Sequence, residues 1–145
     1  MAFNGNFMCT SFKVELMKAV HNFTTGTGDT FKLALYDNTP SFNASTTAYT
    51  SSGEVAASGT YTAGGGTLIN VTPTSSGTTA LTDFADLSFT SATITAYGAM
   101  IYNDSAAGDP SVCILDFGGA KTATNGTFTI IFPTPDATSA IIRIL

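Results

Sequence analysis

TITAYGAMIYN at residues 93–103 is the most informative stretch of this chain, and two further runs follow it: SVCILDFGG at 111–119 and NGTFTIIFPTPDATSAIIRIL at 125–145. All three runs are apolar and aromatic, carry almost no charge, and are separated by Gly, Asn, Asp and Pro. Such runs, bounded by turn residues, are typical of closely spaced and deeply buried strands. They contain no acid–base pair, metal-ligand cluster or activated nucleophile. The segment therefore indicates packing and assembly rather than catalysis.

Strand signals continue toward the N-terminus. The run FKLALY at 31–36 places Phe31, Leu33 and Leu35 on one face of an extended strand. Further strands are predicted at 54–57, 60–63 and 67–72, in a stretch holding Phe84, Leu87 and Phe89, and at 140–144. Ser91 is expected to interrupt the chain before the strand at 93–102.

Residues that favour turns separate these strands. Turns are predicted at Pro73–Gly77, at Gly118-Gly119 and, as a tight hairpin turn, at Asn125-Gly126. The run Gly64–Gly66 predicts a hairpin turn or a bulge, and 103–110 a polar loop. Turn signals thus recur about every eight to twelve residues after residue 30, which favours an antiparallel β-sandwich or barrel.

The N-terminal region has a different pattern. Residues 1–9 are expected to form an extended or flexible arm. Apolar residues then recur with helical spacing from Ser11 to Phe23, and Thr10 or Ser11 is expected to cap this helix. We therefore divide the chain into an arm and short helix at 1–28 and a β-sandwich domain at 29–145. Within that domain, the polar loop at 38–52 is expected to be either functional or packed by its own aromatic residues, Phe42 and Tyr49.

Composition limits the partners of this chain. Only 10% of the 145 residues are charged, against about 25% in ordinary globular proteins. Hydroxyl-bearing and small residues must cover much of the surface, and such a surface is easily desolvated at an interface. The net charge is −5 with only five Lys and Arg residues, so we expect no direct binding of nucleic acid or of an anionic membrane. The N-terminus lacks the features of a signal peptide, and no apolar run is long enough for a membrane span.

Few residues suggest chemistry. His21 is the single histidine, and its place near the end of the predicted helix indicates a surface residue. Cys9 and Cys113 permit a disulfide, although two small apolar core residues are the favoured interpretation. One histidine and two distant cysteines make a poor metal site. We expect no enzyme activity, no cofactor and no bound metal.

The acidic residues fit structural roles. Asp83 with Asp86, and Asp104 with Asp109, could suggest paired carboxylates or a calcium loop, but their spacing matches no calcium loop. Aspartates that initiate turns by bonding their own backbone are the simpler interpretation.

Asp116 lies within an apolar run, where an unpaired buried carboxylate is costly. Three alternatives are open. It faces solvent by strand alternation, it accepts backbone N–H groups of the two following glycines, or it forms a covalent crosslink with Lys32 or Lys121. Arg143, in the last predicted strand, is expected to pair with an acid on a neighbouring strand or subunit.

Several segments, in order, resemble a family of small virion structural proteins of tailed bacteriophages. They are FKLALYDNTPSFNASTTAYT (31–50), SGEVAASGTYTAGGGTL (52–68), TITAYGAMIYN (93–103), SVCILDFGG (111–119), NGTFTIIFP (125–133) and AIIRI (140–144). The resemblance covers about residues 29–145. Members with assigned roles resemble capsid cement or decoration proteins. The resemblance implies a jelly-roll-like or immunoglobulin-like β-sandwich on the capsid exterior, with the major capsid protein as its partner.

The first functional hypothesis is therefore a homo-oligomeric protein, dimeric or trimeric, that cements or decorates a phage capsid. Its expected contact residues lie in the arm and helix and in the loop at 38–52; they are Phe3, Phe7, Met8, Phe12, Phe42 and Tyr49. The alternative is a tail, baseplate or head-fibre component that binds a receptor or glycan. In that case Phe42, Tyr49 and Tyr61 would be exposed for stacking on sugars.

Overall fold

The computed structural model describes residues 3–145; Met1 and Ala2, the first residues of the predicted arm, lie outside the described residues. The chain is mainly β, with 48% strand and 6% helix. Its elements are β1 (Phe7–Met8), α1 (Thr10–Met17), β2 (Phe31–Tyr36), β3 (Gly66–Thr67), β4 (Asn70–Ser76), β5 (Thr79–Phe84), β6 (Leu87–Asn103), β7 (Ser111–Ile130) and β8 (Ile142–Ile144).

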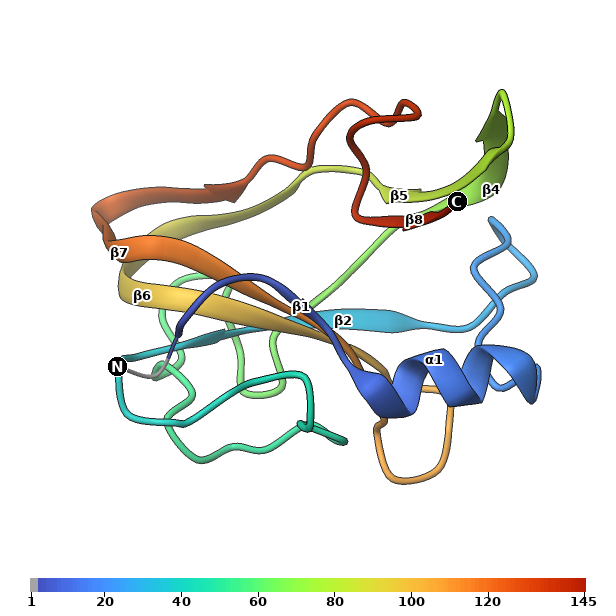
Figure 1. Ribbon diagram of the computed structural model, residues 1–145. Coiled ribbons are helices and arrows are strands. Elements are labelled where there is room, and N and C mark those ends of the chain that lie inside the picture. Colours follow the sequence, from blue (N-terminus) through green and yellow to red (C-terminus); the bar gives the residue numbers. More distant parts are fainter. Residues whose placement is uncertain (1–2) are drawn as a thin grey trace.

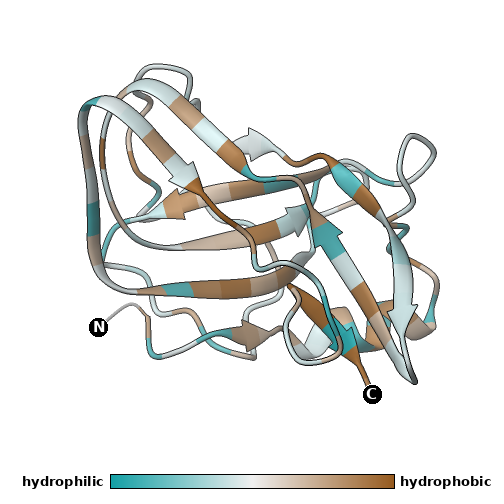
Figure 2. Cartoon of the chain, turned by 90° about the horizontal axis from the view of Figure 1, so that it is seen from above, coloured by the Kyte–Doolittle hydropathy of each residue, from teal (hydrophilic) through white to brown (hydrophobic). Residues whose placement is uncertain are grey.

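Two antiparallel sheets form a sandwich-like fold, which confirms the predicted fold class. The first sheet has the strand order β1-β7-β6-β2-β3, and the second has the order β4-β5-β8. In Figure 1 the lower layer holds β1, β2 and parts of β6 and β7, and the upper layer holds β4, β5 and β8. Hydrophobic segments alternate with paler ones along the long strands (Figure 2), as expected where one face of each strand is buried.

The long hairpin of β6 and β7 belongs to both layers. Both strands run along the lower layer, curl at one end of the molecule and return in the upper layer (Figure 1). The expected interruption at Ser91 and the expected turns at Gly118-Gly119 and Asn125-Gly126 are wrong, because β6 and β7 continue through all three places.

Bulges occupy these places instead. Ala96 pairs with Lys121 and Gly98 with Asp116, so residues 117–120 together lie opposite Tyr97. A second irregularity surrounds Ala92, which pairs with Gly126. Ser91, Gly118, Gly119 and Asn125 all have positive φ. The residues that read as turns supply this backbone shape, and bulges increase bending and twist, which carries the hairpin from one layer to the other.

The short strands were predicted less well than β2, whose bounds are confirmed. Residues 54–57 and 60–63 form only isolated bridges, through Glu54 and Tyr61. The predicted turn at Pro73–Gly77 is wrong, since β4 runs to Ser76 and the turn follows at Gly77. Proline is tolerated within β4 because β4 is an edge strand with a register shift between Val71 and Thr74.

The predicted helix is too long. α1 ends at Met17, because Ala19 has a φ of 57° and breaks the helical backbone. Its N-cap is Cys9, which makes no side-chain cap bond, so the predicted cap at Thr10 or Ser11 is also wrong. Phe23 nevertheless reaches the core from the following loop, where its ring stacks on Phe31 with centroids 4.3 Å apart.

The N-terminal segment is packed on the sandwich. β1 pairs with β7 through Phe7 and Ile114. Phe3 and Phe12 are buried in the same core as the strands. Phe3 lies against Gly98, where an added Cβ would collide with the Phe3 ring and with the backbone of Leu115. The close approach explains why glycine stands at this point of β6.

Candidate interaction surface

Residues 3–145 contain no group of three or more His, Cys, Asp or Glu side chains that could hold a metal ion. Cys9 and Cys113 are free and buried, which confirms them as small core residues. Burial raises the pKa of both thiols above the ordinary value, so neither resembles a reactive thiolate. Asp104 forms an ion pair with Lys32 at 3.1 Å.

The expectation that His21 is a surface residue is wrong. Its side chain is fully buried, and its Nε2 lies 2.8 Å from Oε2 of Glu15. Its Nδ1 lies 3.0 Å from Nδ2 of Asn103, and the same Nδ2 donates to Asp29 at 2.9 Å. The histidine thus joins α1 to the end of β6, and Asn103 extends the link to the loop before β2. This arrangement is a structural tie within the core.

Asp116 combines features of the open alternatives. Its Oδ1 accepts the backbone N–H of Gly118 at 2.8 Å, which is the first of the two glycine N–H groups that one alternative predicted. Its Oδ2 accepts the N–H of Gly5 at 2.8 Å, which sequence reasoning missed. A crosslink with Lys32 is wrong, because Lys32 pairs with Asp104 instead. Arg143 donates to the backbone carbonyl of Ala137 at 2.8 Å.

A cluster of tyrosines around Glu54 holds the long loop between β2 and β3. The Glu54 carboxylate accepts hydrogen bonds from the hydroxyl of Tyr49 at 2.6 Å, from the hydroxyl of Tyr61 at 2.8 Å and from the N–H of Gly64 at 2.8 Å. Tyr49 stacks on Tyr102 with centroids 4.6 Å apart. The predicted packing of this loop by its own aromatics is confirmed. No feature of the sequence predicted that Glu54 would accept hydrogen bonds from these tyrosines. Burial and the nearby Glu54 raise the pKa of Tyr49 to about 12.

The six predicted contact residues lie mostly in the interior of the chain. Their exposures are Phe3 4%, Phe12 0% and Phe42 6%, while Phe7, Met8 and Tyr49 are partly buried and packed against the core. Phe3 and Phe42 touch each other, with ring centroids 5.8 Å apart. The expected exposure of Tyr61 is wrong, because it is fully buried. In this fold these side chains hold the N-terminal segment and the loop in place.

The exposed large apolar side chains lie elsewhere. Among residues 3–145 they are Val14 and Met17 in α1, together with Ile69, Val71, Ile131, Ile144 and Leu145. Near α1, a recess of about 190 Å³ is lined by Leu16, Phe23, Pro73, Ala80, Leu81, Thr82, Ile142 and Ile144. The C-terminal end is strongly hydrophobic in Figure 2.

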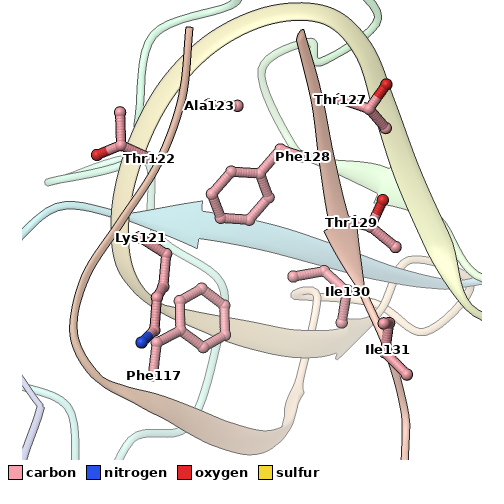
Figure 3. A pocket seen from close by; sticks show the side chains of 9 residues that line it. All are labelled: Phe117, Lys121, Thr122, Ala123, Thr127, Phe128, Thr129, Ile130 and Ile131. Atoms are coloured by element: carbon pink, nitrogen blue, oxygen red, sulfur yellow. The ribbon is translucent and has the colours of Figure 1, made fainter.

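A larger groove lies in the curl of β7, and we call it the β7 groove. It has a volume of about 410 Å³ and is lined by Phe117, Lys121, Thr122, Ala123, Thr127, Phe128, Thr129, Ile130 and Ile131. Figure 3 shows the Phe128 ring between the two arms of β7, with Phe117 and Lys121 on the opposite arm. Its lining residues lie in the part of β7 that pairs with β6 on one edge and, among residues 3–145, with no strand on the other.

Exposed serine and threonine hydroxyls bond to each other between the two strands of the same hairpin. Ser88 bonds Thr129 and Thr95 bonds Thr122, each with oxygens 2.9 Å apart across the two strands. These cross-strand pairs fix the hairpin without charged groups. The hairpin therefore carries hydroxyl pairs between its two strands, and the β7 groove is lined by apolar rings and aliphatic groups together with Lys121 and threonines.

Among residues 3–145, no helix has the length and hydropathy needed to cross a membrane. No protein-family model, curated protein or solved structure matches this chain.

Proposed function

We propose that this protein is a structural virion protein that cements or decorates the icosahedral capsid of a tailed bacteriophage. In this proposal it binds major capsid protein subunits on the outside of the shell, as a dimer or trimer, and catalyses no reaction. The ordered resemblance of segments from 31 to 144 supports the viral assignment. A weakly charged β-sandwich suits a role in which shape and apolar contact replace chemistry.

The observation that carries the proposal is the β7 groove. It joins a strand edge that has no partner strand among residues 3–145 to a recess of about 410 Å³, which is lined by both apolar and polar residues. A feature of this kind suits contact with another protein chain. Many equivalent contacts on one lattice would then act together, giving tight retention without one strong site.

A tail, baseplate or head-fibre component is the second candidate. That function would use aromatic rings exposed for sugar stacking. Phe42 and Tyr61 are 6% and 0% exposed, so these two rings offer no such face. The capsid role is therefore the better supported of the two.

Imaging of purified particles at high resolution tests the proposal. We expect density for this fold at capsomer junctions, in hundreds of copies by quantitative mass spectrometry. Density confined to the tail, a handful of copies per particle, or absence of the protein from purified particles would refute the capsid role.

A further inference from the structure

We propose that the β7 groove binds an extended segment of a partner protein, which adds as a strand to residues 127–131 and places a carboxylate against Lys121. The identity of this partner as a capsid protein rests on the proposed function. The binding mode itself rests on the unpaired backbone edge, the apolar residues of the groove and the charge of Lys121.

The backbone provides the first argument. Phe128, Thr129 and Ile130 pair in regular register with Phe89, Ser88 and Leu87 of β6. On the other side, no strand among residues 3–145 pairs with this part of β7, because β1 pairs only with Cys113 and Ile114. An unpaired strand edge presents N–H and C=O groups that an extended peptide can satisfy.

The side chains define the shape of the ligand. Phe128 and Ile130 point into the groove and are buried, whereas Ile131 at the end of the strand is 76% exposed. A strand beside them would direct every second side chain toward the groove. Apolar residues at alternate positions would pack on Phe128 and Ile130 and close the recess.

Lys121 selects the charge of the ligand. It lines the same groove and forms no ion pair with any residue in the described range 3–145. The rest of the chain carries an excess of acidic groups, with a net charge of −5. An acidic side chain on the partner would pair with Lys121 at the mouth of the groove and fix the register of binding.

These features disfavour a second copy of the chain. Bulges at 117–120 and around Asn125 interrupt the β7 edge, and Lys121 lies between them. Bulges and an edge lysine are devices that limit pairing between identical edges. The regular part that remains is short, which suits a single peptide segment.

The probe is a capped, fluorescently labelled peptide of alternating valine and threonine with one central aspartate. We expect it to bind the full chain, to shift the amide NMR signals of residues 127–131, and to slow hydrogen exchange there. Lys121→Glu should weaken binding about tenfold, as expected when one partly exposed ion pair becomes a repulsion. Lys18→Glu, with the same change of charge on an exposed residue after α1, should leave binding unchanged.

Two modified peptides separate strand addition from simple apolar adhesion. N-methylation of alternate backbone nitrogens should abolish binding, and replacing the aspartate with lysine should weaken it as Lys121→Glu does. Equal binding of the methylated peptide, NMR shifts elsewhere, or dimerisation through residues 127–131 would overturn the inference. Absence of the protein from particles would refute the capsid role alone, so the two failures are distinguishable.

Discussion

The carboxylate of Asp116 accepts the backbone N–H of Gly5 at 2.8 Å, although 111 positions separate the two residues. In return, the side-chain oxygen of Asn6 accepts the N–H of Asp116 at 2.7 Å. The N-terminal segment is therefore bound to β7 beside the bulge through both the side chain and the backbone of Asp116. It belongs to the folded core before any partner arrives.

Replacing Asp116 with alanine should release this segment. We expect the free energy of unfolding to fall by about 2 kcal/mol, because hydrogen bonds to a charged acceptor are lost. Amide exchange near Gly5 should rise, as measured by mass spectrometry. Asp37→Ala is the matched control, since the side-chain oxygen Oδ1 of Asp37 accepts hydrogen bonds from the neighbouring Thr39 and not from the N-terminal segment. Equal exchange in the two variants would show that Asp116 does not hold the segment.

The hydrogen bonds around His21 predict a single tautomer for its imidazole ring. The side-chain oxygen of Asn103 accepts the N–H groups of Ser105 and Ala106, so its Nδ2 must be the donor toward His21. The ring should then carry its proton on Nε2, facing Glu15. Long-range proton–nitrogen NMR spectra should show an unprotonated Nδ1.

The same tie predicts the effect of a buried charge. Asn103→Asp should destabilise the fold by about 3 kcal/mol, because it places a second carboxylate beside Asp29 in the core. Chemical denaturation measures this change. A neutral result would mean that Asn103 does not bond to Asp29 in solution.

The tyrosine cluster predicts loss of stability in alkali. The pKa of Tyr49 rises from its ordinary value of 10.0 to about 12 in the folded state. Between these values the unfolded chain releases a proton that the folded chain retains, so stability should fall as the pH rises from 10 to 12. Phenolate absorbance and thermal unfolding, followed together, test this.

Glu54→Gln provides the control for that titration. Removing the carboxylate should bring the pKa of Tyr49 back toward its ordinary value, since Glu54 contributes both charge and a hydrogen bond to the shift. Asp37→Asn should leave the curve unchanged. An unaltered titration in Glu54→Gln would contradict the role given to this residue.

Replacing Asp83 or Asp86 with asparagine should change the stability of the protein in opposite directions. Burial raises the pKa of Asp83, whose Oδ1 is buried without a hydrogen-bond partner. Asp83→Asn should therefore stabilise the protein at neutral pH, by less than about 1 kcal/mol because solvent screens this half-buried group. The gain should vanish below the ordinary pKa of 3.8.

Asp86→Asn should instead destabilise by about 1 kcal/mol, because Oδ1 of Asp86 accepts the N–H of Phe132 at 2.9 Å and a neutral amide oxygen is a weaker acceptor than a carboxylate. Thermal unfolding of both variants at neutral and acid pH measures the difference. Changes of the same sign would contradict this assignment of the two carboxylates.

Sequence reasoning succeeded where local pattern and burial agree. The bounds of β2 and the packing of the loop after it were predicted from alternation and from Phe42 and Tyr49. The long hairpin was not, because Gly118-Gly119 and Asn125-Gly126 supply positive φ to a turn or to a bulge equally well. Only the presence of a continuous partner strand decides between them.

The sites were harder to predict than the strands. The burial of His21 depends on Glu15, Asp29 and Asn103, which come from three separate segments. The β7 groove exists only because one strand curls back over itself. The spacing of residues in the sequence therefore predicts neither the burial of His21 nor the β7 groove.

Because β6 and β7 each run through both layers, the loop at 104–110 joins two halves that are each incomplete. A cut in that loop would leave an N-terminal piece ending with β6 and a C-terminal piece starting with β7, and neither would enclose a core. The two pieces should therefore remain unstructured apart and fold only when mixed, so that split halves of this protein could report the meeting of whatever proteins they are fused to.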